Sequence, residues 1–169
     1  MSASIVLTGL MGAGKSTVGK ALSKVLKDYT FVDVDDVIVD IEGMSIPDIF
    51  EKKSEAYFRR VEKEVIQELS EEEDLIIALG GGAFEDKNSR EILAENCKVI
   101  YLKSSVERLY SRIKDDKNRP LLQCENPKDK LEELLKLREP NYLKAEFIVE
   151  TDNKTIDEIT QEIIELIME

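Results

Sequence analysis

The sequence contains no histidine and no tryptophan, and only two of its 169 residues are cysteine. Without histidine, a general base must be a carboxylate or a less usual group, and a histidine-based metal site is excluded. Cys97 and Cys124 do not form a metal-binding or redox spacing, so we expect free thiols and a cytoplasmic protein. No apolar run approaches the roughly 20 residues that span a bilayer, and we identify no signal peptide, which excludes a membrane partner.

The sequence also has fewer basic than acidic residues. Lysine and arginine together number 24 against 36 aspartates and glutamates, which gives a formal net charge of −12. Such a charge argues against binding to nucleic acid or to an anionic membrane. The length fits a single α/β domain over residues 1–169, and we expect a monomer.

The most specific motif is GLMGAGKST at residues 9–17, which fits the phosphate-binding pattern G-x-x-x-x-G-K-[ST]. Its glycines let the backbone N–H groups point at phosphate oxygens, next to the positive end of a helix dipole. Lysine in this pattern reaches the β- and γ-phosphates, and the following hydroxyl ligates Mg²⁺. The expected nucleotide contacts are Gly12, Ala13, Gly14, Lys15, Ser16 and Thr17.

Apolar runs of strand type alternate with segments of helical periodicity along the whole chain. The expected strands are residues 4–8, 29–34, 75–79, 99–102 and 147–149, and the expected helices include 15–26, 54–70 and 126–142. This alternation predicts a mainly parallel sheet with helices on both faces, which is a three-layer α/β fold. Ligands of such sheets bind beyond the carboxyl ends of the strands.

Two polar segments should therefore meet the phosphate-binding loop. Asp33 and Asp35 end the second expected strand, where alternation points both carboxylates to one side. Such a pair can hold Mg²⁺ through water, and one member can accept the proton of an attacking hydroxyl. The alternative is a solvated acidic surface, and the neighbouring Asp36 leaves the assignment open. Residues 80–82 are three glycines, which form either a ligand-binding loop or a flexible turn.

Arg138 is the most informative cation, because it continues an inward-facing apolar stripe of helical spacing. A buried arginine either extends to solvent or pairs with a group inside, and arginine binds carboxylates through two parallel hydrogen bonds. Helical periodicity separates Arg59 from Arg60 only weakly. Arg119 lies in a polar segment, at about residues 113–126, that could close over the phosphates as a mobile lid.

Together these segments resemble shikimate kinase. The matching segments are residues 9–17, 31–35, 58–60, 80–83, 119–122 and 138–142. The resemblance implies a five-stranded parallel sheet of the nucleoside-monophosphate-kinase type with a mobile lid. It also implies transfer of the ATP γ-phosphoryl group to the 3-hydroxyl of shikimate, in chorismate biosynthesis, with Mg²⁺.

By matching position, the resemblance assigns catalysis to Lys15, Asp35 and Arg119. Lys15 would hold the phosphates, and Arg119 would join them when the lid closes. Asp35 would bind the ring hydroxyls and orient or deprotonate the attacking one. Ser16 would ligate Mg²⁺, and Asp33 would help to position it through water.

The remaining positions concern the two substrates. Arg59 and Arg138 would bind the shikimate carboxylate, with backbone contacts from Gly81 and Gly82. Arg112 and Lys154 would flank the adenine, although both could also be ordinary surface charges. Lysine at position 154 departs from the arginine that is common there, and lysine cannot lie as flat on adenine. A second departure, Val34 in place of serine or threonine between the aspartates, should have little effect.

Two alternatives remain at this stage. A gluconate-type kinase also needs cations and hydroxyl contacts for a polyol carboxylate, but the three glycines and the two placed arginines favour a cyclic substrate. A catalytically inactive nucleotide-binding regulatory module would be expected to have lost at least one of the catalytic residues named above.

Overall fold

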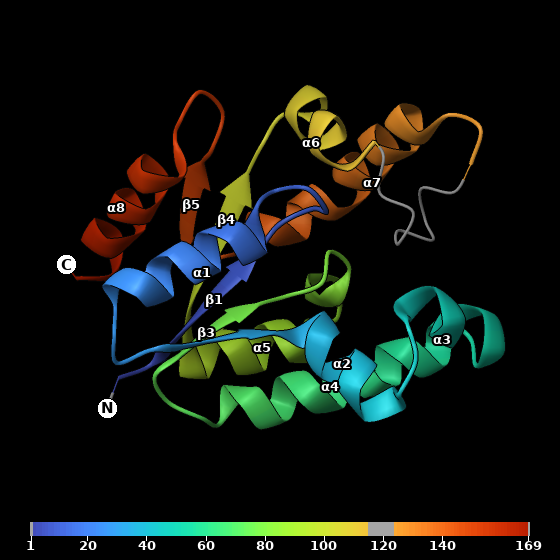
Figure 1. Ribbon diagram of the computed structural model, residues 1–169, viewed down its shortest axis with the longest axis horizontal. Coiled ribbons are helices and arrows are strands. Elements are labelled where there is room, and N and C mark those ends of the chain that lie inside the picture. The colour runs from blue at the N-terminus through green and yellow to red at the C-terminus, as the bar shows by residue number, and fades with distance from the viewer. Residues whose placement is uncertain (1, 115–123, 169) are drawn as a thin grey trace.

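The protein is described by a computed structural model, which covers residues 2–114 and 124–168. Its centre is a five-stranded, all-parallel sheet with the strand order β2-β3-β1-β4-β5 (Figure 1). The strands are β1 (Ser4–Thr8), β2 (Thr30–Asp33), β3 (Leu75–Ala78), β4 (Cys97–Lys103) and β5 (Phe147–Glu150). The predicted number and direction of the strands are confirmed.

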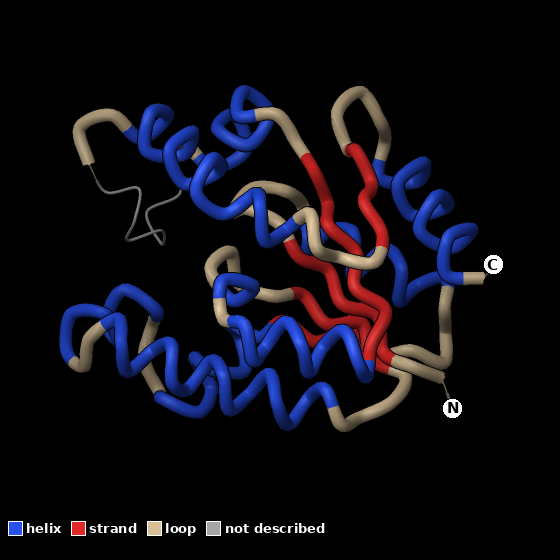
Figure 2. The backbone as a smooth tube through the Cα atoms, turned by 180° about the vertical axis from the view of Figure 1, so that it is seen from behind, coloured by secondary structure: helices blue, strands red, loops and turns tan. Residues whose placement is uncertain are grey.

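Helices cover both faces of this sheet. Helices α1 (Lys15–Val25) and α8 (Ile156–Ile167) pack on one face, and α4 (Glu55–Ser70) and α5 (Lys87–Asn96) lie on the other (Figures 1 and 2). The remaining elements are α2 (Val34–Glu42), α3 (Ile46–Lys52), the short 3₁₀ helix η1 (Ala83–Glu85), α6 (Val106–Ile113) and α7 (Pro127–Tyr142). Within residues 2–114 and 124–168, every helix is too short or too polar to cross a membrane.

Two of the three inner strands, β1 and β3, explain why the sheet could be predicted from the sequence. Every residue of β1 and β3 is buried, as expected for strands covered on both faces, which appear as continuous apolar runs. Helix α7 also follows its pattern, because its inward stripe is buried and contains Arg138, which is 6% exposed.

The second strand differs from the prediction. β2 ends at Asp33, and α2 begins directly at Val34. The sequence had predicted that the strand continues through Val34. The Asp33 carboxylate caps this helix, accepting hydrogen bonds from the backbone N–H groups of Asp35 at 2.9 Å and Asp36 at 3.4 Å. The alternating residues at 31–35 resemble a strand, whereas Val34 and Ile38 are in fact buried at helical spacing. The proposed alternation of Asp33 and Asp35 along one strand was therefore wrong.

Candidate active site

The phosphate-binding loop joins β1 to α1 and takes a conformation that requires glycine. Gly12 and Gly14 have φ values of 85° and 91°, which other residues rarely adopt. The loop curls around Lys15, whose Nζ donates to the carbonyl oxygens of Gly9 at 2.5 Å and Leu10 at 3.2 Å. The loop therefore holds the lysine ammonium at the N-terminus of α1, where the helix dipole favours a bound anion.

A cavity of about 260 Å³ lies over this loop. Its wall includes Gly12, Gly14, Lys15, Ser16, Thr17, Asp33, Asp35, Gly80, Gly81 and Arg112. Ala13 is the exception among the predicted loop residues, because it is buried and its N–H donates to the Leu10 carbonyl at 3.1 Å. The structure thus brings the loop, both aspartates and the glycine run together.

Asp33 reaches this cavity while it caps α2. One carboxylate oxygen accepts the helix N–H groups, and the other accepts a hydrogen bond from the Ser16 hydroxyl at 2.7 Å. Asp35 lies in the first turn of α2 and lines the same cavity. The cap, instead of strand alternation, is what places both aspartates in the wall of the same cavity.

Arg112 comes from the last turn of α6 and approaches the loop from the other side of the cavity. Its Nη1 donates to the Gly12 carbonyl at 2.9 Å. Burial and the neighbouring Arg108 lower the pKa of Arg112, while Asp152 raises it. Arg112 is thus placed against the phosphate-binding loop, and its predicted contact with the adenine stays a prediction.

A second cavity of about 360 Å³ contains the two predicted carboxylate-binding arginines. Arg59 extends from α4 and Arg138 from α7, and Gly82 lies in the same wall. One terminal nitrogen of Arg138 is buried and has no hydrogen-bond partner within the described residues. A buried guanidinium N–H without a partner carries a large desolvation cost, which a bound anion would relieve.

The glycine run separates the two cavities, and two of its glycines, Gly80 and Gly82, leave room for a charged side chain. A Cβ on Gly80 would lie 2.8 Å from Oδ1 of Asp35, and one on Gly82 would lie 2.6 Å from the Arg59 guanidinium. At Gly81 the neighbour is Arg138, at 3.4 Å. Their φ values are not positive, so backbone conformation does not require glycine here. A Cβ on Gly80 or Gly82 would press against Asp35 or Arg59, whereas one on Gly81 would make an ordinary van der Waals contact. Three predicted site residues thus converge on three consecutive residues.

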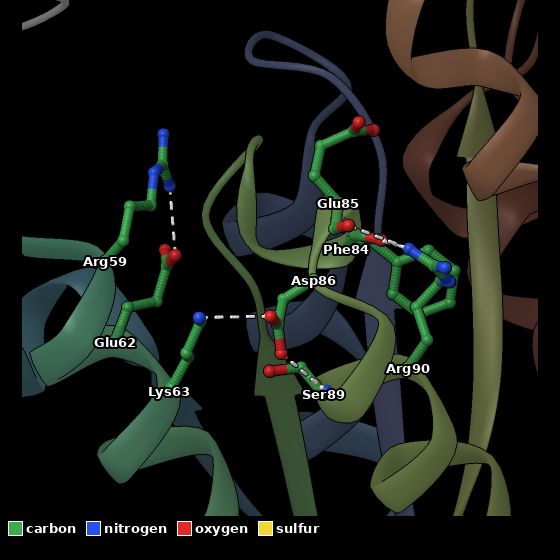
Figure 3. Close-up of polar contacts among 8 residues, drawn as sticks. All are labelled: Arg59, Glu62, Lys63, Phe84, Glu85, Asp86, Ser89 and Arg90. Carbon is green, nitrogen blue, oxygen red and sulfur yellow. Dashed lines mark hydrogen bonds and ion pairs between the residues drawn. The ribbon is translucent and has the colours of Figure 1, made fainter. Parts of the chain in front are cut away.

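Glu62 is a site residue that the sequence analysis missed. It lies on the buried side of α4, is 3% exposed, and accepts a hydrogen bond from Arg59 at 2.9 Å (Figure 3). Burial raises the pKa of Glu62, and the charge of Arg59 offsets part of this. Glu62 follows Arg59 by three residues, and this spacing in a helix could have predicted an ion pair between them. Arg60, in contrast, is exposed and lies over the Tyr57 ring, which resolves the ambiguity between the two arginines.

One predicted nucleotide contact does not reach the cavity, and another falls outside the described residues. Lys154 pairs with Glu162 of α8, with 2.9 Å between Nζ and Oε2, and it does not line either of the two cavities. Its role at the adenine stays a prediction. Arg119 and most of the expected lid lie outside the described residues.

We predict that Gly82→Ala raises the KM for the acceptor by about tenfold, because the new methyl group displaces the Arg59 guanidinium. Gly19→Ala is the matched substitution, since its methyl group would meet the Phe31 ring at 2.3 Å inside the core. It should lower the Tm by roughly 3–10 °C instead. Steady-state kinetics and thermal unfolding of both variants test this, and an unchanged acceptor KM in Gly82→Ala contradicts it.

The raised pKa of Glu62 predicts a specific pH dependence of stability. The folded protein holds the Glu62 proton more tightly than the unfolded chain, so this group stabilises the fold below its ordinary pKa. That contribution is lost as the pH rises through the raised pKa. The free energy of unfolding of the wild type should therefore fall relative to that of Glu62→Gln over this window. Urea unfolding of both proteins from acid to neutral pH measures the difference, and a constant difference refutes the prediction.

The comparisons with known proteins agree with this geometry. The model of the family described as "Shikimate kinase" matches residues 11–168. A shikimate kinase of Burkholderia lata is 44% identical over 156 residues, covering 92% of this chain and 84% of that protein. The solved shikimate kinase of Acinetobacter baumannii in complex with shikimate is 43% identical, with a TM-score of 0.96, and the match covers 99% of this chain and 94% of that one.

A more distant likeness concerns the alternative substrate. A gluconokinase from Sinorhizobium meliloti has a TM-score of 0.58 at 20% identity, covering 95% of this chain and 88% of that one. This likeness shows a shared fold alone. The chain itself belongs to the shikimate kinase family.

Proposed function

We propose that this protein transfers the γ-phosphoryl group of ATP to the 3-hydroxyl of shikimate. The observation that carries the proposal is the meeting of two cavities at Gly80, Gly81 and Gly82, one over the phosphate-binding loop and one between Arg59 and Arg138. The family uses ATP as its co-substrate, and the relative from A. baumannii holds shikimate. The first cavity contains Lys15 and Ser16, which can bind phosphates and a metal ion. The second contains the guanidinium groups of Arg59 and Arg138, which can bind a carboxylate, although four carboxylates also line it.

The donor set at Ser16 and Asp33 fits Mg²⁺. A hydroxyl and a carboxylate already lie 2.7 Å apart at the phosphate-binding loop, and both are hard oxygen ligands. The described residues contain no cluster of three or more acidic, cysteine or histidine ligands, which fits an ion that keeps most of its contacts to water and phosphate. When bound, Mg²⁺ would neutralise charge on the phosphates, with Asp33 contacting it through water.

The chain's own residues would then carry out positioning and charge stabilisation, which is most of what phosphoryl transfer demands. Lys15 would hold the β- and γ-phosphates. Asp35 would orient the 3-hydroxyl and accept its proton as the new bond from oxygen to the γ-phosphorus forms. The bond from that phosphorus to the β-phosphate oxygen breaks, and ADP leaves.

The shikimate carboxylate would be bound by Arg59 and Arg138, with backbone contacts from Gly81 and Gly82. Glu62 fixes the guanidinium of Arg59 by an ion pair, so this arginine is already oriented before an acceptor binds. We further propose, from the resemblance alone, that Arg119 joins the phosphates and that Lys154 flanks the adenine opposite Arg112.

We propose also that the chain acts as a single-domain monomer in the cytoplasm. The net charge of −12 disfavours nucleic acid and anionic membranes as partners. Sedimentation and cell fractionation measure these properties directly.

The deciding experiment measures ADP release with ATP and Mg²⁺ and with shikimate or gluconate in parallel. Turnover with shikimate is the expected result. Turnover with gluconate alone would replace the proposal by a gluconate-type kinase. Tight ATP binding without turnover on either acceptor would replace it by a regulatory module.

A further inference from the structure

The carboxyl end of α7 contributes a side chain that lies between the glycine run and the core. Tyr142, the last residue of this helix, is fully buried, and its hydroxyl donates a hydrogen bond to the Gly81 carbonyl. Its ring stacks on Tyr101 of β4, with 5.0 Å between centroids and 27° between planes. The Tyr101 hydroxyl donates instead to Glu139 at 2.6 Å. Only one hydroxyl of this stacked pair reaches the glycine run.

Its acceptor belongs to the central peptide of a turn, which is closed by hydrogen bonds from the Ala83 N–H to the Gly80 carbonyl and from the Glu85 N–H to the Gly82 carbonyl, both at 3.2 Å. The Gly81 carbonyl and the Gly82 N–H belong to the same planar peptide unit and point in opposite directions. Both residues lack a side chain, so the peptide plane between them can rotate at little cost. A hydrogen bond that fixes the carbonyl therefore also fixes the direction of the Gly82 N–H.

Tyr142 also belongs to the helix that carries Arg138. The two residues are four apart, so they lie on the same face of α7, and both are buried. The Gly81 Cβ position lies 3.4 Å from the Arg138 guanidinium. The hydroxyl thus connects the arginine and the glycine backbone, which come from elements almost 60 residues apart.

We infer that Tyr142 is a positioning residue for the acceptor's carboxylate: its hydroxyl fixes the Gly81–Gly82 peptide, so that the Gly82 N–H and the Arg138 guanidinium present one preformed anion site. This inference rests on the proposed function, because it concerns the same acceptor. Tyr142 itself acts through the peptide and does not take part in the transfer.

The ionisation of the phenol agrees with a donor role. Burial raises the pKa of Tyr142 well above its ordinary value, and the charge and hydrogen bonding of Arg138 offset only part of this. Glu85 raises that pKa and Arg59 lowers it. The hydroxyl therefore stays protonated and remains a donor across the pH range of an enzyme assay.

The chain offers a matched pair of variants. Tyr142→Phe and Tyr101→Phe each remove one hydroxyl from the same buried stack, but only the first removes the bond to Gly81. We expect Tyr142→Phe to raise the KM for shikimate by about tenfold, with kcat and the KM for ATP changed by less than about twofold. Tyr101→Phe should leave all three constants within about twofold of the wild type. An equal rise of the shikimate KM in both variants overturns the inference.

A second measurement does not depend on turnover. The protein has eight glycines, so selective ¹⁵N-glycine labelling gives a small set of amide signals. In Tyr142→Phe the Gly82 amide signal should shift or broaden, because its peptide becomes free to exchange between orientations on the microsecond to millisecond timescale. In Tyr101→Phe it should not. An unchanged Gly82 signal in Tyr142→Phe refutes the inference, whereas absence of shikimate turnover in the wild type refutes only the proposed function.

Discussion

Replacing Arg138 by alanine is expected to raise the KM for shikimate by about 100-fold, with the KM for ATP changed by less than about twofold. Arg138 is 6% exposed, and one of its terminal nitrogens has no hydrogen-bond partner within the described residues. The Arg138 guanidinium can therefore donate a hydrogen bond to an anion in the cavity that it lines together with Arg59. Truncation removes a buried charge–carboxylate contact, which accounts for the size of the effect.

Arg60→Ala is the control, since Arg60 is exposed, lies over the Tyr57 ring and does not line either cavity. It should leave both Michaelis constants near those of the wild type. If Arg138→Ala raised the KM for ATP more than that for shikimate, Arg138 would serve the nucleotide, and the assignment of the two cavities would be reversed.

Replacing Asp35 by asparagine is expected to lower kcat by about 1,000-fold while the protein stays folded. The two side chains have nearly the same shape, so the space beside Gly80 stays filled. What is lost is the carboxylate that orients the acceptor hydroxyl and takes its proton. The measurement is kcat for ADP release at saturating shikimate, together with thermal unfolding.

Asp36→Asn provides the same change one residue further along α2. Asp36 is exposed and does not line either cavity. It should retain a kcat within about twofold of the wild type. Similar losses in both variants would mean that net negative charge near the loop matters, and not the Asp35 carboxylate itself.

Some of the site could be predicted because its residues are constrained by local chemistry. The phosphate-binding loop needs glycine where φ is positive and lysine at the start of the helix, and both are visible as letters at fixed spacing. The same holds for Arg138, because a charged residue on an apolar helical stripe stands out without any knowledge of its partners.

Other parts could not be predicted, since they depend on which elements meet. Asp33 was predicted to reach the site through strand alternation, whereas the structure places it there as a helix cap. A cap and a strand end give the same alternating pattern of residues. Glu62 looked like one of many acidic residues until α4 was placed against the glycine run. Tyr142 looked like the end of an apolar stripe.

The sequence by itself determined that this chain forms a parallel α/β sheet with a phosphate-binding loop, since periodicity and backbone conformation are local properties. Only the tertiary structure decided why Gly80 and Gly82 are glycines. Their backbone conformation does not demand it, but Asp35 and Arg59 come from two different helices to the places that a Cβ on Gly80 and a Cβ on Gly82 would occupy. Such a requirement depends on which elements meet in the folded protein, and a local sequence pattern carries no information about that.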